Sequence, residues 1–157
     1  MNPKVKPIPK SYEAPTPYLV VRDGEKAIDF YKRAFGATEV MRMPGPDGKI
    51  GHADLAIGKG HVMLADESPE MGHRSPGSFG GTPVTIVLYV KKVDDVVKAA
   101  VDAGAKLMRP VTDEFYGDRM GTVTDPFGHV WHVMTHFEDV SMEEMEKRAA
   151  EKAGAPA

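Results

Sequence analysis

The spacing of hydrophobic and polar positions near the start of the chain predicts a strand followed by a helix. Residues 18–21 read YLVV, an apolar run typical of a short buried strand. Asp23 comes next and belongs to the residue types favoured just before a helix. The apolar residues after it recur at helical spacing: Ala27, Ile28, Tyr31, Ala34 and Phe35. We therefore predict a helix that starts after Asp23 and stops at Gly36.

Three strand candidates follow this helix, each bounded by glycine or proline turn residues. They cover residues 37–43, 49–58 and 61–66. The first half of the chain therefore reads strand, helix and three strands, or βαβββ.

The second half of the chain repeats this order. A strand is predicted over 84–90, a helix over 93–104, and strands over 105–111, 118–124 and 129–136. The second half is therefore also βαβββ.

The duplication can be checked by subtraction. Gly36 and Gly104 end the two predicted helices 68 positions apart (104 − 36 = 68). Residues 60–62 and 128–130 both read Gly-His-Val, again 68 positions apart (128 − 60 = 68). A repeat of this kind decides the architecture. One helix covers only one face of a sheet, so pairing two curved sheets would enclose a cavity suited to a ligand.

The expected fold class is α+β, with two βαβββ modules that form a curved-sheet cavity and a C-terminal helix. Ser141 and Glu144 have the spacing of a capping box, and the residues after them favour a helix. The organisation we expect is a flexible arm over 1–15, a paired-module domain over 16–137 and a helical tail over 138–157. Within the domain, module one covers about 16–66, a linker 66–83 and module two about 84–137.

Composition narrows the chemistry that this fold can carry. The 157 residues include no cysteine, which excludes disulfides, thiolate metal sites and cysteine nucleophiles. Twenty basic and 23 acidic residues give a net charge of −3, and the absence of a basic patch argues against nucleic acid as a partner. Residues 1–15 hold no apolar run of the kind that a signal peptide or membrane span needs, so we expect a cytoplasmic protein without a membrane partner.

Several segments resemble a known superfamily. The paired βαβββ modules, AIDFYKRAFGA at 27–37 and FYGDRMGTVTDPFGHVWHV at 115–133 resemble the vicinal oxygen chelate superfamily of glyoxalases, bleomycin-resistance proteins and dioxygenases. The segments HADLAIG at 52–58, MLADE at 63–67 and FYGDR at 115–119 resemble sequences of the PhnB-like subgroup. The similarity covers roughly residues 16 to 140.

The resemblance implies one divalent metal held by His and Glu side chains, which acts as a Lewis acid on two adjacent substrate oxygens. The four ligand positions of the glyoxalases fall at Thr16, about Leu64, Thr85 and His132. Only His132 carries a side chain that could bind the metal. The resemblance also implies a homodimer.

Two histidines stand out as candidate site residues. His132 lies in an alternating strand and could line the cavity or bind a metal, but it could equally be a core histidine bonded to a neighbouring strand. His52 shares a strand face with Asp54, and the pair could supply an acid–base group and its orienting partner. His52 is the second candidate metal ligand, and its alternative is an exposed strand face. The other histidines fall in or beside turns and are expected at the surface.

Tyr116 and Arg119 precede or begin a predicted strand and complete the candidate ligand-binding set. An arginine at a cavity mouth can grip a carboxylate or phosphonate through two parallel hydrogen bonds, which favours an anionic or carbonyl-bearing ligand. The alternative is a local ion pair between Arg119 and Asp118, or a solvated turn.

These observations favour a cavity-forming homodimer that binds a small organic molecule without the standard His/Glu metal site. The alternative is a metal-dependent lyase, isomerase or dioxygenase with a displaced site centred on His132 and including one divalent metal. A third possibility is an interaction module that uses the helix after Ser141 to bind a partner, although the apolar face of that helix is thin. Whether the protein is an enzyme stays open at this level.

Overall fold

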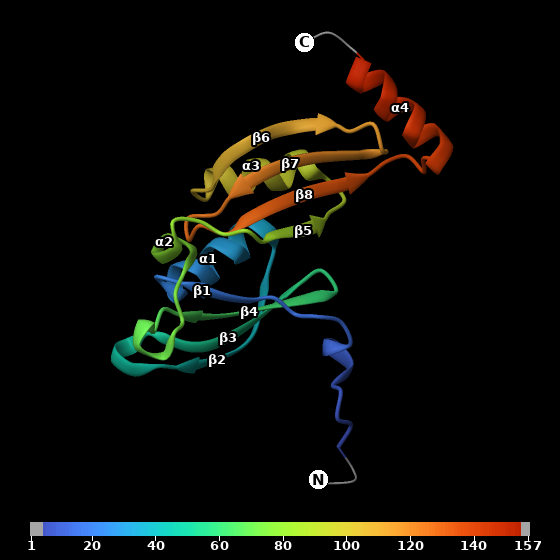
Figure 1. Cartoon of the computed structure of the whole chain (residues 1–157). Helices are drawn as coiled ribbons and strands as arrows, with labels where there is room; N and C mark the ends of the chain where they lie inside the picture. Colours follow the sequence, from blue (N-terminus) through green and yellow to red (C-terminus); the bar gives the residue numbers. More distant parts are fainter. Residues whose placement is uncertain (1–4, 155–157) are drawn as a thin grey trace. The chain divides into compact units, whose positions relative to one another are not determined.

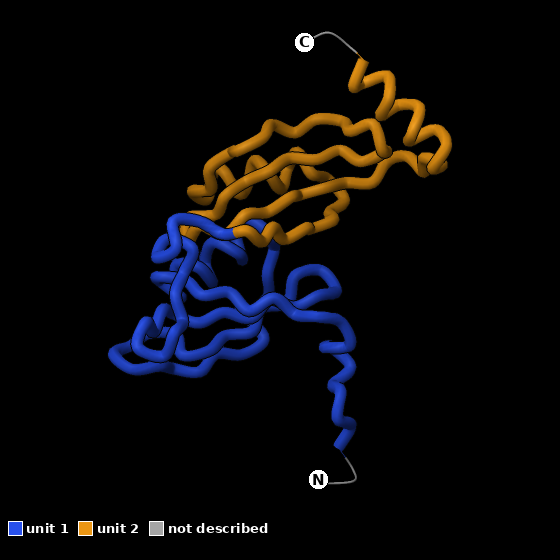
Figure 2. The backbone as a smooth tube through the Cα atoms, in the orientation of Figure 1, with its two compact units in different colours: residues 1–82 blue, residues 83–157 orange. Residues whose placement is uncertain are grey.

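The structure is a computed structural model that describes residues 5–154 of the chain. These residues form two compact units that divide between Thr82 and Pro83, drawn in blue and orange in Figure 2. The extreme ends of the predicted arm and tail, residues 1–4 and 155–157, lie outside the described residues.

Unit 1 carries the first βαβββ module together with the arm and the linker (Figure 1). Its main elements are β1 (Tyr18–Val21), α1 (Gly24–Phe35), β2 (Thr38–Pro44), β3 (Ile50–Ile57) and β4 (Gly60–Asp66). Short helical turns flank them: η1 (Lys10–Tyr12), η2 (Pro46–Gly48), η3 (Pro69–Met71) and α2 (Pro76–Phe79).

Unit 2 carries the second module and the C-terminal helix. Its elements are β5 (Thr85–Tyr89), α3 (Val93–Asp102), β6 (Lys106–Asp113), β7 (Asp118–Thr124), β8 (Val130–His136) and α4 (Met142–Gly154). The predicted fold, two βαβββ modules followed by a C-terminal helix, is therefore confirmed. Glu144 N donates to Ser141 Oγ at 3.2 Å at the start of α4, as the capping box predicts.

Each unit contains one four-stranded sheet with the same order of strands. The orders are β1-β4-β3-β2 and β5-β8-β7-β6. The first strand of each module runs parallel to the last, and the other neighbours are antiparallel. This order puts the last strand of each module inside the sheet, where its side chains face both the helix and the opposite side.

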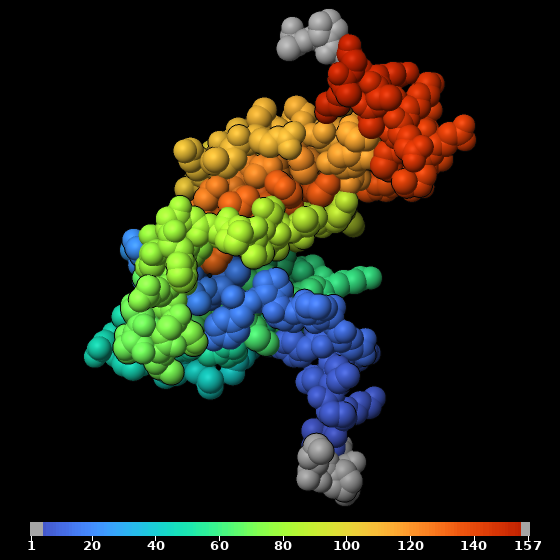
Figure 3. Space-filling view, in the orientation of Figure 1, coloured from blue at the N-terminus to red at the C-terminus, as the bar shows by residue number. Residues whose placement is uncertain are grey.

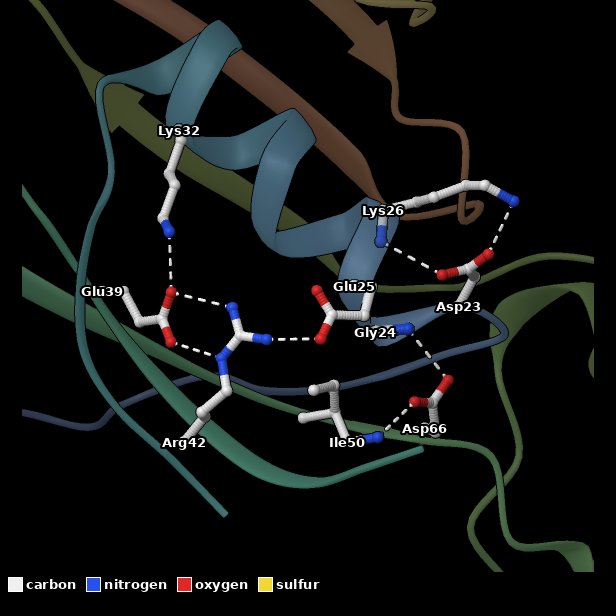
Figure 4. A network of polar contacts seen from close by, with 9 residues as sticks. All are labelled: Asp23, Gly24, Glu25, Lys26, Lys32, Glu39, Arg42, Ile50 and Asp66. Atoms are coloured by element: carbon white, nitrogen blue, oxygen red, sulfur yellow. Dashed lines mark hydrogen bonds and ion pairs between the residues drawn. The ribbon is translucent and has the colours of Figure 1, made fainter. Parts of the chain in front are cut away.

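One face of each sheet is packed against its helix, and a polar side chain at the end of the last strand fixes which face. In unit 1, Asp66 accepts hydrogen bonds from Gly24 N at 2.9 Å, where α1 begins, and from Ile50 N at 2.7 Å (Figure 4). In unit 2, Thr135 Oγ1 accepts from Val93 N at 3.0 Å, where α3 begins. The side chains directly before Asp66 and Thr135, and every second side chain counted back from them, therefore point away from the helices. We call this side the open face of each sheet.

Helix α1 is also fastened to the edge strand β2 by charged side chains (Figure 4). Arg42 pairs with Glu25 and Glu39, and Lys32 Nζ lies 2.6 Å from Glu39. Hydrogen bonds from Arg42 and then from Lys32 lower the pKa of Glu39 to about 2. Asp23 caps the same helix by accepting from Lys26 N at 3.1 Å, as the sequence predicts.

The core of each unit lies between its sheet and its helix. The most deeply buried apolar side chains of unit 1 are Val21, Ile28, Tyr31, Leu55 and Leu64. Those of unit 2 are Val93, Val123, Trp131 and Val133. All of these strand residues point toward a helix. The open faces carry both polar and apolar side chains, and some of these, such as Asp54 and Met134, are buried as well.

The structural repeat is offset by 69 residues in the first and last strands of the modules, where the sequence suggests 68. Leu19 pairs with Leu64 in unit 1, and Leu88 pairs with Val133 in unit 2 (88 − 19 = 69; 133 − 64 = 69). The third strands still match at 68, because Ala53 also pairs with Leu64 and Gly121 also pairs with Val133 (121 − 53 = 68). One extra residue therefore lies in the connection from β7 to β8.

The predicted linker holds a short helix that the hydrophobic pattern does not indicate. Helix α2 has four residues, too few for a periodic signal; Pro76 begins it and Gly80, with a φ of 77°, ends it. At the other end of the chain, α4 (red in Figure 3) contacts the β6–β7 connection of its own unit through Arg148 and Lys152. No helix within residues 5–154 has both the length and the apolar character needed to cross a membrane.

Candidate functional site

His132 lies at the centre of the open face of the unit 2 sheet. It stands opposite Val87 on β5 and Thr122 on β7, and its Nδ1 is 2.9 Å from Thr122 Oγ1. Burial lowers the pKa of His132 below its usual value, and the nearby positive charge of Arg109 lowers it further. His132 is therefore a neutral imidazole at pH 7, and the bond at Nδ1 leaves Nε2 for other contacts.

Arg109 supplies a positive charge beside this imidazole. Its Nη2 lies 3.2 Å from Glu114 Oε1, while the Arg109 side chain stays 56% exposed. Glu114 itself is buried and also accepts from Thr112 Oγ1 at 3.3 Å. Lys152 on α4 lies 3.5 Å from the other Glu114 oxygen, so the carboxylate is held from two sides and positions Arg109.

Tyr116 contributes a phenol to the same face. Its hydroxyl lies 3.8 Å from the sulfur of Met120, which is two residues before Thr122 on the same face of β7. Burial raises the pKa of Tyr116 above its usual value, and the carboxylates of Glu114 and Asp118 raise it further. The Tyr116 phenol therefore remains protonated, and can donate a hydrogen bond, over the physiological pH range.

Arg119 lies on the other face of this sheet, toward α3. It stands opposite Thr135, and it forms a bidentate pair with Asp94 in the first turn of α3 through two contacts of 2.8 Å. A third contact of 2.8 Å joins it to Asp113. Asp118, the partner that the sequence offers as an alternative, instead accepts from the Tyr89 hydroxyl and lies 2.7 Å from His136 Nδ1.

The open face of the unit 1 sheet carries His52 and Asp54, the other two candidates. His52 Nδ1 is 3.0 Å from the Tyr18 hydroxyl, and the two rings are stacked with centroids 5.5 Å apart. Asp54 is buried, lies 2.8 Å from His61 Nδ1 and accepts a hydrogen bond from the Tyr12 hydroxyl. His52 and Asp54 thus share a face, as the alternation predicts, but each is bonded to a different partner.

Neither unit offers the His and Glu set that the superfamily resemblance implies. Leu64, the residue obtained by ungapped carry-over, is fully buried on the helix side of β4. The residue that corresponds to His132 at an offset of 69 is Met63, which faces the open side but is not a usual ligand for the hard divalent metal implied there. Within residues 5–154, no three His, Asp or Glu side chains are grouped so that they could hold a metal ion. The donor set therefore does not fit the implied group.

A separate pocket of about 290 Å³ lies at one end of the unit 1 sheet. Residues of the β2–β3 turn and of the segment after β4 line it, and none of the predicted ligand-binding residues does. Its carboxylates already have partners: Asp66 accepts from two backbone N–H groups, Glu67 from Ser75 N and Ser78 Oγ, and Glu70 from Ser68 Oγ. We therefore place the candidate site on the open faces rather than in this pocket.

The sequence does not identify Arg109 or His61 as site residues. Arg109 lies on an edge strand with shifts in its register, so its neighbours cannot be read from alternation. His61 begins a strand after a glycine turn, so the sequence predicts a surface position, whereas its side chain is only 12% exposed. Alternation with Met63 could have placed His61 on the open face, because the two are separated by one residue on β4.

The pKa values of the two histidines of β8 should be shifted in opposite directions from the usual value. We expect the midpoint of His132 below 6.5 and that of His136 above 6.5, because hydrogen bonds to Asp139 and then to Asp118 raise the pKa of His136. Histidine ring signals followed by NMR from pH 4 to 9 would measure both. Arg109→Gln should raise the His132 midpoint without moving that of His136, and equal midpoints in the wild type would contradict the geometry.

The comparisons with known proteins agree with this fold. Residues 14–133 match the model of the Glyoxalase/Bleomycin resistance protein/Dioxygenase superfamily. An uncharacterized protein of Mycobacterium tuberculosis is 48% identical over 134 residues, which cover 83% of this chain and 79% of that protein. The solved structure of a gene product of Arabidopsis thaliana has a TM-score of 0.62 and 29% identity, covering 78% of this chain and 98% of that one. TioX from Micromonospora sp. ML1 has a TM-score of 0.61 and 29% identity, with coverage of 78% and 97%.

Proposed function

The chain belongs to the glyoxalase/bleomycin resistance protein/dioxygenase superfamily, and we propose that it binds a small organic molecule carrying a carboxylate or carbonyl group. The binding surface is the open face of the β5–β8 sheet. The ligand oxygens lie against Arg109 and His132, and the rest of the ligand lies against the apolar side chains of the same face.

The observation that carries this proposal is the exposed Arg109 on the same face as the paired His132 and Thr122. A guanidinium that is 56% exposed can add a ligand carboxylate to its contact with Glu114, because its planar fork has five N–H donors. The Thr122 hydroxyl and His132 are held 2.9 Å apart in the middle of the sheet, so little freedom is lost when they contact a ligand oxygen. Tyr116 adds a protonated hydroxyl to the same set.

The apolar part of the face suits an aromatic or aliphatic ligand body. Met120 and Met134 stand opposite each other on β7 and β8 and form a largely buried floor under this surface, and their thioether chains adapt to varied shapes. Val87 and Tyr89 on β5 are 52% and 58% exposed and extend this surface. We therefore propose an amphipathic ligand with one anionic or carbonyl end.

Binding of this kind needs no metal held by His and Glu. The positions carried over from the resemblance hold Thr16, about Leu64 and Thr85 in addition to His132, and the structural repeat replaces Leu64 with Met63, which also supports a metal-independent site. Elemental analysis of protein purified without added metal tests this inference directly. Stoichiometric metal that disappears in His132→Ala would instead support a metal-dependent enzyme with a displaced site.

We further propose that the protein is a PhnB-like homodimer of the cytoplasm. The segments FYGDR and DPFGHVWH support the subgroup, and dimerisation follows from that resemblance. Light scattering coupled to size-exclusion chromatography measures the mass of the particle. A mass of one 17.1 kDa chain across the working concentration range would contradict the dimer.

Phenylacetate and its neutral amide, phenylacetamide, form a matched pair of probes for this site. We expect phenylacetate to shift the NMR signal of the His132 ring and to bind at least about ten-fold more tightly than the amide, because a charge-assisted hydrogen bond contributes about 1.5–3 kcal/mol. Arg109→Gln should remove this preference.

Arg119→Gln is the control, since it deletes the same charge from the opposite face of the same sheet. We expect it to bind phenylacetate within about two-fold of the wild type, because its ion pairs are partly exposed and distant from the ligand. Equal losses in the two variants, or no preference for the carboxylate in the wild type, would contradict the proposed site.

A further inference from the structure

The chain places one of its own phenols on the open face of unit 1. Tyr12, in the turn η1, donates its hydroxyl hydrogen bond to Asp54 Oδ2 on β3. Its ring lies against His61 on β4, with ring centroids 4.7 Å apart and planes tilted by 47°. The phenol therefore makes both kinds of contact that a bound ligand would make, a polar contact at its hydroxyl and an aromatic contact at its ring.

Asp54 and His61 form the surface that Tyr12 covers. The Asp54 side chain is only 3% exposed, and its Oδ1 lies 2.8 Å from His61 Nδ1. A buried carboxylate needs hydrogen bonds on both oxygens, and the Tyr12 hydroxyl donates to Oδ2. The hydrogen bond to Asp54 raises the pKa of Tyr12 above its usual value, so the phenol keeps the proton that it donates.

The segment that carries Tyr12 has little else to hold it. From residue 5 to residue 15, every residue except Tyr12 is exposed, and η1 is a turn of three residues. The backbone hydrogen bond of Tyr12 N is local, to Pro9 O at 2.9 Å. The Tyr12 side chain is therefore the main anchor of the segment, and a competing phenol could replace it without disturbing a strand.

Unit 2 contains a similar group of tyrosine, aspartate and histidine, but its tyrosine lies in a strand and not in an exposed turn. Tyr89 donates to the buried Asp118 at 2.6 Å, and Asp118 lies 2.7 Å from His136 Nδ1. Tyr89 belongs to β5, whose backbone is paired along its length with β8. Displacing Tyr89 would break a sheet, whereas displacing Tyr12 requires only the release of an exposed turn.

We propose that Asp54 and His61 form a binding site for phenolic molecules and that Tyr12 occupies it as a displaceable lid. The ligand hydroxyl donates to Asp54 Oδ2, and the ligand ring packs on the imidazole of His61. This site is separate from the carboxylate site proposed on the other unit, so either proposal can fail without the other. The affinity of the wild type for a phenol is then reduced by the fraction of molecules in which the lid is closed.

The probe for this site is p-cresol, which is the side chain of tyrosine up to its β-carbon. We expect Tyr12→Ala to bind p-cresol at least ten-fold more tightly than the wild type, measured by calorimetry or by the NMR shift of the His61 ring. Toluene, which lacks only the hydroxyl, should bind Tyr12→Ala at least ten-fold more weakly than p-cresol. Tyr12→Phe keeps the lid ring without its donor and should lie between the wild type and Tyr12→Ala.

Two further measurements keep the test decisive. Tyr18→Ala removes a neighbouring phenol that contacts His52, and it should leave the p-cresol affinity within two-fold of the wild type. In the wild type itself, saturating p-cresol should release residues 5–15, which would appear as sharpened NMR signals even if a variant failed to fold. Equal affinity of the wild type and Tyr12→Ala for p-cresol, or equal affinity of Tyr12→Ala for toluene and p-cresol, would overturn the proposal.

Discussion

Asp125→Ala should lower the free energy of unfolding of unit 2 by about 3 kcal/mol or more, because it leaves several buried donors without their acceptor. Asp125 is 4% exposed and accepts three hydrogen bonds of 2.9 Å. Two come from the backbone N–H groups of Phe127 and His129, which shape the turn between β7 and β8. The third comes from the indole N–H of Trp131, which is almost fully buried.

Urea unfolding followed by tryptophan fluorescence reports on unit 2, because Trp131 is the single tryptophan of the chain. Asp139→Ala is the control: it removes an exposed carboxylate of the same unit, which lies 3.0 Å from His136 Nε2. We expect that control within about 0.5 kcal/mol of the wild type. An Asp125→Ala protein that unfolds at the wild-type urea concentration would show that the turn does not depend on the carboxylate.

The pattern of apolar residues and of glycine and proline turns predicts most of the fold. Strands β1, β3, β4, β7 and β8 bury apolar side chains, while the more exposed strands β2, β5 and β6 are marked by the turns and helices that bound them. Each of the eight predicted strands overlaps an observed strand. Helices α1 and α3 lie where their apolar spacing places them, and α4 lies where the capping box and the helix-forming residues after it place it. The helix α2 is the exception, since four residues complete only one turn and show no periodicity. Secondary structure in this chain is thus encoded locally wherever an element is long enough to repeat its pattern.

The equivalence of the two modules could be predicted only to within one residue. The repeated Gly-His-Val suggests an offset of 68, but His61 lies within β4 whereas His129 lies in the turn before β8. A shift of one residue reverses the side of a strand to which a side chain points. The offset of 69 therefore makes Met63, and not the buried Leu64, the position in module one that is equivalent to His132. Hydrogen-bond register decides such a question, and register depends on strands that are distant in sequence.

The candidate site shows the same division between local and distant information. His52 and Asp54 share a strand, and alternation alone puts them on one face. Arg119 and Arg109 belong to different strands, and the sequence offers no signal that the first turns toward α3 while the second lies near His132. Tyr12 lies in a segment without periodicity, so its contact with Asp54 could be found only in three dimensions.

Gly117→Ala should destabilise unit 2 by about 3 kcal/mol or more, because it combines backbone strain with a clash against the backbone. Gly117 has a φ of 92°, which an alanine adopts at a cost of about 1–2 kcal/mol. An added Cβ would also stand 2.1 Å from the carbonyl oxygen of Glu138, so the chain after β8 would have to move. The Gly117 carbonyl accepts from Phe137 N and Glu138 N at 3.0 and 3.1 Å, and these bonds would be lost in the movement.

Gly104→Ala separates the two causes, since Gly104 also has a positive φ, of 113°, but its added Cβ would meet only the ring of Pro126 at an ordinary 3.6 Å. We expect this control to cost about 1–2 kcal/mol in the same fluorescence measurement, the strain without the clash. Because Gly117 adjoins Tyr116, its variant should also weaken phenylacetate binding, whereas Gly104→Ala should not. Equal losses of stability in the two variants would mean that the segment after β8 moves away freely and does not hold the β6–β7 connection in place.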